Sequence, residues 1–269
     1  MPEGQAPVTG ERTPGRILLT GGSGRLGTEL RAELPALGLE VFAPPRTGLD
    51  LTRPETISEA LERYAPDVVV HAAAYTDVAG AETEREVCWA SNVGGTRKVV
   101  LALAGSETKL VHVSSDYVFW GDKGGYAEHD TPGPVRNYYA LSKLAAEEVA
   151  RTRPGTLVIR TSFRPREWPY PVAFEDVYTS QDYVDVIAPE VALAVRYASY
   201  IPHPILHIAT ERKSVYELAR RRSPNVQPGR RRDSKVSLPE DISLDIRLWR
   251  SLKEQLPKKE VQAGSTKSP

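Results

Sequence analysis

The residues best placed to do chemistry are a tyrosine and a lysine four positions apart, Tyr139 and Lys143. Both fall in segment 138–151, whose apolar periodicity predicts a helix, so the two side chains share one helix face. A neighbouring ammonium favours the phenolate and is expected to lower the pKa of Tyr139 toward the working pH. The pair can then transfer a proton at a carbonyl or alcohol oxygen. Tyr138 has no lysine at this offset, and the pattern by itself is equally typical of an ordinary amphipathic helix.

A glycine-rich segment, residues 20–27 with the sequence TGGSGRLG, links a predicted strand at 17–20 to a predicted helix at 25–37. Glycines permit a tight turn and a close approach of the backbone to a pyrophosphate, which then lies at the N-terminus of the helix. The spacing is G-x-x-G-x-x-G rather than G-x-G-x-x-G, so the strand–turn–helix context carries this interpretation. An ordinary strand–helix turn is the alternative.

Two further motifs follow predicted strands. Residues 71–76 (HAAAYT) end the strand at 67–73, where small side chains allow a cofactor to lie flat against the sheet edge. Residues 113–119 (VSSDYVF) end the strand at 110–114, where a hydroxyl can donate a hydrogen bond to a substrate carbonyl. Helix–sheet packing by alanine and turn capping by serine are the structural alternatives, and His71 is expected to be a core or sheet-end histidine.

The elements around these motifs alternate between strands and helices, and the strands are apolar on both faces. This pattern predicts a doubly wound α/β fold, in which helices cover a parallel Rossmann-type sheet and ligands bind beyond the carboxyl ends of the strands. Further strands are expected at residues 39–43, 157–160 and 205–208. Further helices are expected at residues 54–64, 84–104 and 191–200.

The regularity fails at residues 163–185 and 223–245, which are rich in proline, arginine and aromatic or acidic residues. Such segments, leaving the ends of strands, are candidate substrate-binding elements. We therefore expect an NAD(P)-binding domain at 15–162, completed by about 186–210, and a small, partly interleaved C-terminal lobe. The lobe is expected at 163–185 and 211–255, with flexible tails at 1–14 and 256–269.

The composition excludes several classes of protein. Lys plus Arg and Asp plus Glu both number 35, so a formal net charge of zero gives no reason to expect nucleic acid or an anionic membrane as a partner. The only cysteine, Cys88, excludes an internal disulfide and fits the reducing cytoplasm. No apolar run reaches the ~18 residues of a transmembrane helix. No secretory signal and no metal site are expected.

In this order and at these positions, the motifs resemble those of the extended short-chain dehydrogenase/reductases, and most of all the dTDP-4-dehydrorhamnose reductase branch of that family. The likeness is strong over residues 16–163. The segments that carry it are GGSGRLG at 21–27, LDL at 49–51, DVVVHAAAYTDVAGAE at 67–82, HVSSDYVFWGDKGGYAEHD at 112–130, YYALSK at 138–143 and IRTSF at 159–163.

The resemblance implies roles for individual residues. The catalytic hydroxyl, the acid/base and the lysine fall on Ser115, Tyr139 and Lys143. The residues expected to bind or support the cofactor are Gly21, Ser23, Gly24, Arg25, Leu26, Asp50, Leu51, Ala73, Ala74, Tyr75, Asn92, Tyr139 and Lys143. The residues expected near the substrate are Ser115, Asp116 and Phe163.

Three departures from the family's pattern concern the substrate. Ser115 stands where the reductases usually have threonine, and Phe163 stands where they usually have tryptophan. Residues 163–171 (FRPREWPYP) also replace a longer apolar stretch. The substrate lobe is therefore expected to be reduced.

The resemblance implies NAD(P)H-dependent reduction of a 4-keto nucleotide sugar by a cytoplasmic enzyme. Tyr139 would protonate the oxygen that Ser115 polarises, and Lys143 would hold the nicotinamide ribose. An epimerase of the same family is one alternative, whereas dehydration is disfavoured because Tyr117, not a glutamate, follows Asp116. The other alternative is a non-catalytic NADP-binding regulatory subunit, similar to the methionine adenosyltransferase β subunit, which the shortened lobe favours and the intact triad opposes. A homodimer is left open.

The end of the second predicted strand, residues 43–46 (APPR), bears on the choice of cofactor. It has no acidic residue to bind the ribose 2′-hydroxyl of NAD(H). Arg46 can instead pair with a 2′-phosphate. NADP(H) is therefore the preferred cofactor and NAD(H) the alternative, unless Arg46 is only a solvated loop residue.

Arg164 and Arg166 leave the end of a predicted strand and could contact the substrate. Arginine forks suit a diphosphate, and the rings of Trp168 and Tyr170 suit a nucleobase or a sugar face. We expect this segment to clamp a nucleotide sugar, although a proline-stiffened surface loop has the same composition. Alternative phosphate contacts are the arginine runs at 220–222 and 230–232.

Overall fold

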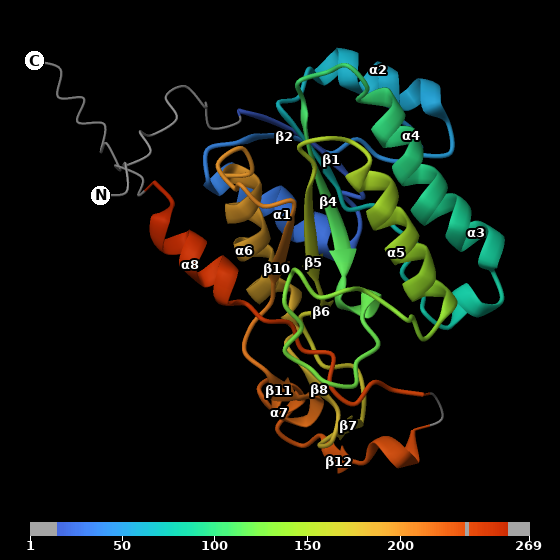
Figure 1. Cartoon of the computed structure of the whole chain (residues 1–269), viewed down its shortest axis with the longest axis vertical. Coiled ribbons are helices and arrows are strands. Elements are labelled where there is room, and N and C mark those ends of the chain that lie inside the picture. The colour runs from blue at the N-terminus through green and yellow to red at the C-terminus, as the bar shows by residue number, and fades with distance from the viewer. Residues whose placement is uncertain (1–14, 235–236, 258–269) are drawn as a thin grey trace, which may run out of the picture.

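A six-stranded parallel sheet forms the centre of the molecule (Figure 1). The structure, a computed structural model, describes residues 15–234 and 237–257. The strand order is β10-β5-β4-β3-β1-β2. The strands are β1 (Arg16–Thr20), β2 (Glu40–Phe42), β3 (Val68–His71), β4 (Lys109–Ser115), β5 (Leu157–Thr161) and β10 (Ile205–Ile208). The predicted doubly wound α/β fold is confirmed. The tail expected at 1–14, and residues 258–269 of the tail expected at 256–269, lie outside the described residues.

Helices cover both faces of this sheet (Figure 1). Ile17 and Leu19 of β1 lie in a core with α1, α6 and α8, whereas Leu18 lies in a second core with α2 and α4, because successive strand residues point to opposite faces. The helices are α1 (Arg25–Ala36), α2 (Pro54–Tyr64), α3 (Arg85–Trp89), α4 (Gly95–Ala102), α5 (Tyr138–Arg151), α6 (Val184–Arg196), α7 (Val215–Arg220) and α8 (Arg247–Gln255), with 3-10 turns at Gly80–Glu82, Asp116–Val118 and Arg231–Asp233. Within the described part of the chain, no helix has the length and apolarity needed to cross a membrane.

The long helix predicted at 84–104 is divided by a π-helical turn. Helix α3 is followed by the π-helix Ala90–Gly94 and then by α4. In this turn Asn92 accepts a hydrogen bond at Oδ1 from the backbone of Tyr75 at 2.7 Å and donates one from Nδ2 to Ser142 Oγ at 2.8 Å. A single widened turn alters the apolar period only locally, so the sequence pattern did not report it.

Helix α6 begins earlier than the predicted start at residue 191. It covers Val184–Arg196 and contains Pro189. Proline lacks an amide hydrogen and disfavours a helix interior. Ile187, Ala188 and Val191 nevertheless have 0% exposed surface in the core. Packing of the apolar face therefore outweighs the local cost of the proline.

The segments predicted to be irregular form a small lobe beyond the sheet, and short strand pairs join them (Figure 1). The pairs are β6 (Phe163–Arg164) with β9 (Asp182–Tyr183), β7 (Val172–Phe174) with β12 (Gln227–Gly229), and β8 (Tyr178–Thr179) with β11 (Lys213–Ser214). The lobe has its own core of Ala173, Val177, Val215, Ala219 and Val226. Strands of two or three residues are too short to leave a periodic pattern in the sequence.

Helix α8 packs on the large domain rather than on the lobe, where the predicted boundary at 211–255 placed it. Trp249 is 1% exposed and lies in the core shared with α1 and α6. Its Nε1 donates to Glu190 Oε2 at 2.6 Å, and the same oxygen accepts from Lys253 Nζ at 2.7 Å. The chain therefore returns from the lobe to the sheet layer at α8.

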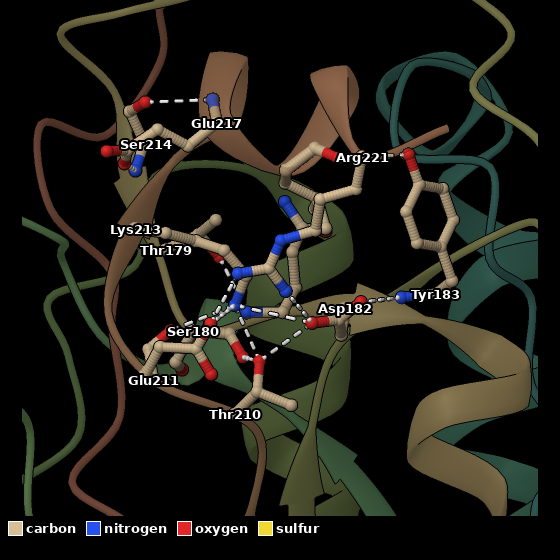
Figure 2. A network of polar contacts seen from close by, with 12 residues as sticks. Thr179, Ser180, Asp182, Tyr183, Thr210, Glu211, Lys213, Ser214, Glu217 and Arg221 are labelled. Carbon is tan, nitrogen blue, oxygen red and sulfur yellow. Dashed lines mark hydrogen bonds and ion pairs between the residues drawn. The ribbon is translucent and has the colours of Figure 1, made fainter. Parts of the chain in front are cut away.

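A buried polar network joins the lobe to the end of β10 (Figure 2). Lys213 Nζ donates to Thr210 Oγ1 at 2.5 Å and to the carbonyl of Glu211 at 2.9 Å, and it lies 3.5 Å from Asp182 Oδ2. Arg221 Nη1 donates to the same Asp182 oxygen at 2.9 Å. Buried charges are stable only when paired and hydrogen-bonded, so these contacts fix β9, β11 and α7 relative to the sheet.

A fully buried ion pair joins β5 to α5. Arg160 Nη2 donates to Glu147 Oε1 at 2.7 Å, and both side chains are 0% exposed. Glu147 Oε2 also accepts from Ser114 Oγ at 2.7 Å, and the Arg160 guanidinium lies 5.0 Å from the ring centroid of Phe119. The pair therefore connects the two central strands to the helix that carries Tyr139.

We expect Glu147→Gln to lower the free energy of unfolding by about 3–5 kcal/mol, because it leaves the Arg160 charge buried without a counter-ion. Urea denaturation near neutral pH measures this loss. Glu148→Gln is the matched control, since the ion pair of Glu148 with Arg151 on the same helix is exposed and its loss should cost less than ~1 kcal/mol. Equal losses in the two variants would contradict a structural role for the buried pair.

Candidate active site

A cleft of about 1650 Å³ is lined by the carboxyl ends of the sheet strands and by the lobe. The predicted site residues that line it are Gly21, Ser23, Gly24, Arg25, Leu26, Arg46, Asp50, Leu51, Ala73, Ala74, Ser115, Asp116, Tyr139, Lys143, Phe163 and Arg164. Tyr75, Asn92 and Arg166 do not line it. The four sequence motifs, which are far apart along the chain, thus converge on one cavity.

The glycine loop between β1 and α1 forms a close-fitting wall of this cleft. Gly21 has a φ of 73°, and a Cβ there would lie 2.7 Å from the Cα of Ala73. Thr20 Oγ1 accepts a hydrogen bond from the amide of Ala73 at 3.2 Å, which holds the ends of β1 and β3 together. Helix α1 starts after Gly24 without a side-chain cap, so its first-turn amides have no side-chain acceptor. This wall suits an anionic group such as a pyrophosphate.

Arg46 and Asp50 form an exposed ion pair at another part of the wall. Arg46 Nε lies 3.5 Å from Asp50 Oδ2, and the Arg46 side chain is 80% exposed. Asp50 Oδ1 accepts hydrogen bonds from the amide and hydroxyl of Thr52 at 2.9 and 2.8 Å. These hydrogen bonds, and to a smaller extent the Arg46 charge, hold the pKa of Asp50 below its ordinary value. The Arg46 side chain is therefore largely exposed and accessible to a ligand.

Ser115, Tyr139 and Lys143 meet where β4 ends and α5 begins. The Asn137 side chain caps α5 by accepting from the amide of Ala140 at 2.8 Å, which places Tyr139 in the first turn. Lys143 Nζ donates to the carbonyl of Val113 in β4 at 2.8 Å. Burial lowers the pKa of Lys143 to about 8. The triad implied by the resemblance is thus brought together at one end of a strand.

The expectation that Lys143 lowers the pKa of Tyr139 is wrong for this structure. Desolvation raises the pKa of Tyr139, the negative charge of Asp116 adds to the rise, and a hydrogen bond with Ser115 opposes it. Asp116 is itself buried, and this burial raises its pKa to about 6 against the opposing effect of hydrogen bonds from Ser162 and Ser115. The Ser115 hydroxyl donates to Asp116 Oδ1 at 3.2 Å. Tyr139 is therefore a protonated group, ready to act as an acid.

Two of the residues predicted to support the cofactor lie behind the cleft wall. The Tyr75 hydroxyl donates to Glu84 Oε2 at 2.8 Å, and the Tyr75 backbone is held by buried Asn92. Asn92 contacts the loop after β3 through the Tyr75 backbone and contacts α5 through Ser142. His71 is buried between Thr20 and Thr96 hydroxyls, at 2.8 and 3.0 Å, which confirms it as a core histidine.

The predicted arginine clamp is only partly present. Arg164 lines the cleft, but Arg166 forms two hydrogen bonds with Glu29 of α1, at 2.8 and 2.6 Å. The arginine runs at 220–222 and 230–232 do not line the cleft. The ion pairs of these runs join Arg221 to Asp182 and Glu211, Arg222 to Asp185, Arg230 to Glu175, Arg231 to Glu240 and Arg232 to Asp233.

Other cleft residues were not identified from the sequence. Arg136 stacks its guanidinium 4.0 Å from the ring centroid of Trp120, just before the helix cap at Asn137. An asparagine ahead of a helical pattern is a capping signal and could have drawn attention to this position. Gln181 and Leu238 also line the cleft. They lie in the two irregular segments predicted to bind substrate, but without periodicity no signal marks these two residues individually.

Comparison with known proteins agrees with this arrangement. The family described as the RmlD substrate binding domain matches residues 15–166. The dTDP-4-dehydrorhamnose reductase of Mycobacterium tuberculosis (strain H37Rv) is 39% identical over 154 residues, which are 55% of this chain and 50% of that protein. The enzyme of the same name from Burkholderia thailandensis is 43% identical over 152 residues, again 55% and 50%. The chain therefore spans about half the length of the curated relatives it matches.

Solved structures extend the similarity to the lobe. The crystal structure of dTDP-4-dehydrorhamnose reductase from Bacillus anthracis in complex with NADP has a TM-score of 0.78 and 25% identity, covering 88% of this chain and 92% of that one. A hypothetical dTDP-4-dehydrorhamnose reductase from Sulfolobus tokodaii has a TM-score of 0.77 and 32% identity, covering 88% and 94%. The match at 15–166 includes all four motifs of the cleft. The chain therefore belongs to the RmlD substrate binding domain family, as its motifs indicated.

Proposed function

We propose that the chain is an NADPH-dependent reductase of a 4-keto nucleotide sugar, with an activity like that of the dTDP-4-dehydrorhamnose reductases it resembles. The observation that carries this proposal is the convergence of the glycine loop with Ser115, Tyr139 and Lys143 in one cleft. The loop suits a dinucleotide, and the three side chains suit proton transfer to a carbonyl oxygen. The related enzyme from Bacillus anthracis binds NADP, which supports the choice of cofactor.

The cleft residues fit such a cofactor. When bound, NADPH supplies a hydride from its nicotinamide ring. The backbone at Gly21 and the uncapped start of α1 after Gly24 would hold the pyrophosphate. Arg46 would bind the 2′-phosphate in place of Asp50, and Lys143 would hold the nicotinamide ribose. NAD(H), which has no 2′-phosphate, would gain nothing from Arg46.

Tyr139 would donate a proton to the substrate's carbonyl oxygen. Desolvation and the Asp116 charge keep its phenol protonated, which is the state that an acid needs. The Ser115 hydroxyl, at the end of β4, would donate a hydrogen bond to the same oxygen and increase its polarity. Lys143, one turn along α5, donates to the carbonyl of Val113 and would act through the nicotinamide ribose. In the reverse reaction Tyr139 would act as the base.

The two alternative functions have less support. An epimerase would use the same cleft, and no feature of the described residues favours it over a reductase. A regulatory subunit needs the cofactor site alone, so the assembled Ser115, Tyr139 and Lys143 argue against it. The homodimer and the cytoplasmic location stay predictions.

We expect Tyr139→Phe to reduce turnover roughly 10²–10⁴-fold, because only the proton donor is removed. NADPH oxidation with a dTDP-4-keto-6-deoxy sugar measures turnover, and NADPH fluorescence measures binding, which should stay within about twofold. Tyr138→Phe, one residue away on α5, is the matched control and should retain activity. If Tyr139→Phe turned over substrate like the wild type, the hypothesis of a non-catalytic regulatory subunit would replace that of a catalytic Tyr139.

We expect Lys143 to make stability depend on pH. Burial lowers its pKa from 10.5 to about 8 in the folded chain, so between these values the unfolded chain binds more protons and stability rises with pH. The free energy of unfolding of the wild type, relative to that of Lys143→Met, should rise by up to ~3 kcal/mol between about pH 8 and 10.5. Urea denaturation of both proteins at several pH values measures it. If the two stability profiles ran parallel with pH, burial would not lower the pKa of Lys143.

We expect Arg46→Ala to weaken NADPH binding by about tenfold, because a charge-assisted hydrogen bond to the 2′-phosphate is lost. NADH binding by the same variant is the internal control and should not change. Fluorescence titration with the two cofactors measures both affinities. A wild type that bound NADH at least as tightly as NADPH would rule out this role for Arg46.

A further inference from the structure

Arg164 is the arginine of the segment after β5 that is left without a carboxylate partner. Within residues 160–166, all of them described, Arg160 is paired with buried Glu147 and Arg166 with Glu29 of α1. Arg164 forms no ion pair with a described residue, and it lines the cleft. Its charge is therefore available to a ligand, whereas those of its neighbours are committed to the fold.

Aromatic rings hold Arg164 in place. Its guanidinium carbon lies 5.5 Å from the ring centroid of Trp168 and 5.9 Å from that of Tyr170, and the two rings meet edge to face at 5.6 Å. Cation–π contacts leave the N–H edge of a guanidinium for oxygen acceptors. Arg164 Nε and Trp168 Nε1 are buried and form no hydrogen bond with the described residues. These donor atoms are therefore not used in hydrogen bonds within the described part of the chain.

The position of Arg164 relative to the reacting groups suits the proposed substrate. Its charge acts on Asp116, where it opposes the rise in pKa that burial causes. Asp116 accepts a hydrogen bond from Ser115, so Arg164 faces the same part of the cleft as the carbonyl to be reduced. In a 4-keto nucleotide sugar the diphosphate is attached across the ring from the keto carbon. A sugar between Tyr139 and Arg164 would therefore present its diphosphate toward the guanidinium.

We propose that Arg164, framed by Trp168 and Tyr170, binds the diphosphate of the nucleotide sugar. Its N–H edge would donate paired hydrogen bonds to two phosphate oxygens. Arg166 has no part in this contact, because it is held by Glu29 outside the cleft. The inference rests on the proposed reductase function, and it names the residue that would bind the diphosphate of that substrate. It also replaces the two-arginine clamp expected from the sequence by a single arginine.

The test is calorimetric binding of dTDP and UDP in the presence of saturating NADP⁺, so that the glycine loop is already occupied. Arg164→Gln should raise the Kd at least ~10-fold, because its charged hydrogen bonds are lost. Arg166→Gln is the matched control in the same segment and should stay within about twofold. Thymidine, which has no phosphate, should bind wild type and Arg164→Gln equally. An unchanged NADP⁺ affinity in both variants shows that they are folded.

Several outcomes would overturn the proposal. If Arg164→Gln bound dTDP and UDP with the same Kd as the wild type, the contact would be excluded. The contact would also be excluded if Arg164→Gln and Arg166→Gln weakened binding equally, or if the wild type bound neither nucleotide. A loss confined to UDP-glucuronate, with UDP and UDP-glucose unaffected, would assign Arg164 to a sugar carboxylate instead. Nucleotide binding through Arg164 without turnover of any keto sugar would leave this site standing and remove the reductase function. Turnover of a keto sugar by the wild type, with an unaltered Kd for dTDP and UDP in Arg164→Gln, would support the reductase function and remove the Arg164 site.

Discussion

The buried ion pair between Arg160 and Glu147 sets the position of the helix on which the active site depends. Both charges have lost their hydration, so the pair is stable only when its geometry and remaining hydrogen bonds are complete. Ser114 of β4 completes them by donating to Glu147. Lys143 and Tyr139 lie one and two turns before Glu147 on the same helix face. The contact that fixes α5 against the two central strands therefore also brings these two side chains to the end of β4.

Desolvation at that point explains the electrostatics of the site. A buried environment favours the neutral form of every group, so one cause moves acids and bases in opposite directions. It lowers the pKa of Lys143, and it raises the pKa values of Asp116 and Tyr139. The Asp116 charge adds to the effect on Tyr139. A phenol that keeps its proton beside a polarising hydroxyl, that of Ser115, is suited to protonate a carbonyl oxygen rather than to start as a phenolate.

Features that depend on neighbouring residues could be read from the sequence. The apolar period and the cap at Asn137 define α5, whose observed bounds, Tyr138–Arg151, are those predicted. The run of β-branched residues in β3 and the glycines after β1 predicted parallel strands with a ligand-binding edge. Because carboxyl ends of parallel strands share one edge of a sheet, motifs at three strand ends had to converge. The order of these motifs indicated the family, and the resemblance to that family implied the roles of Ser115, Tyr139 and Lys143.

Features that depend on distant residues were decided only by the tertiary structure. Arg166 is held by Glu29, 137 positions away in the chain, and Arg164, two residues earlier, is not. Nothing in the composition of their segment distinguishes the two arginines. The direction of the Tyr139 pKa likewise follows from burial and from Asp116, whereas the sequence showed only the lysine one turn away. The sequence thus determined the types of side chain at the cleft and the elements that carry them. Packing decided which charges are used within the fold and which face a ligand, because ion pairing and desolvation depend on contacts in space rather than on spacing along the chain.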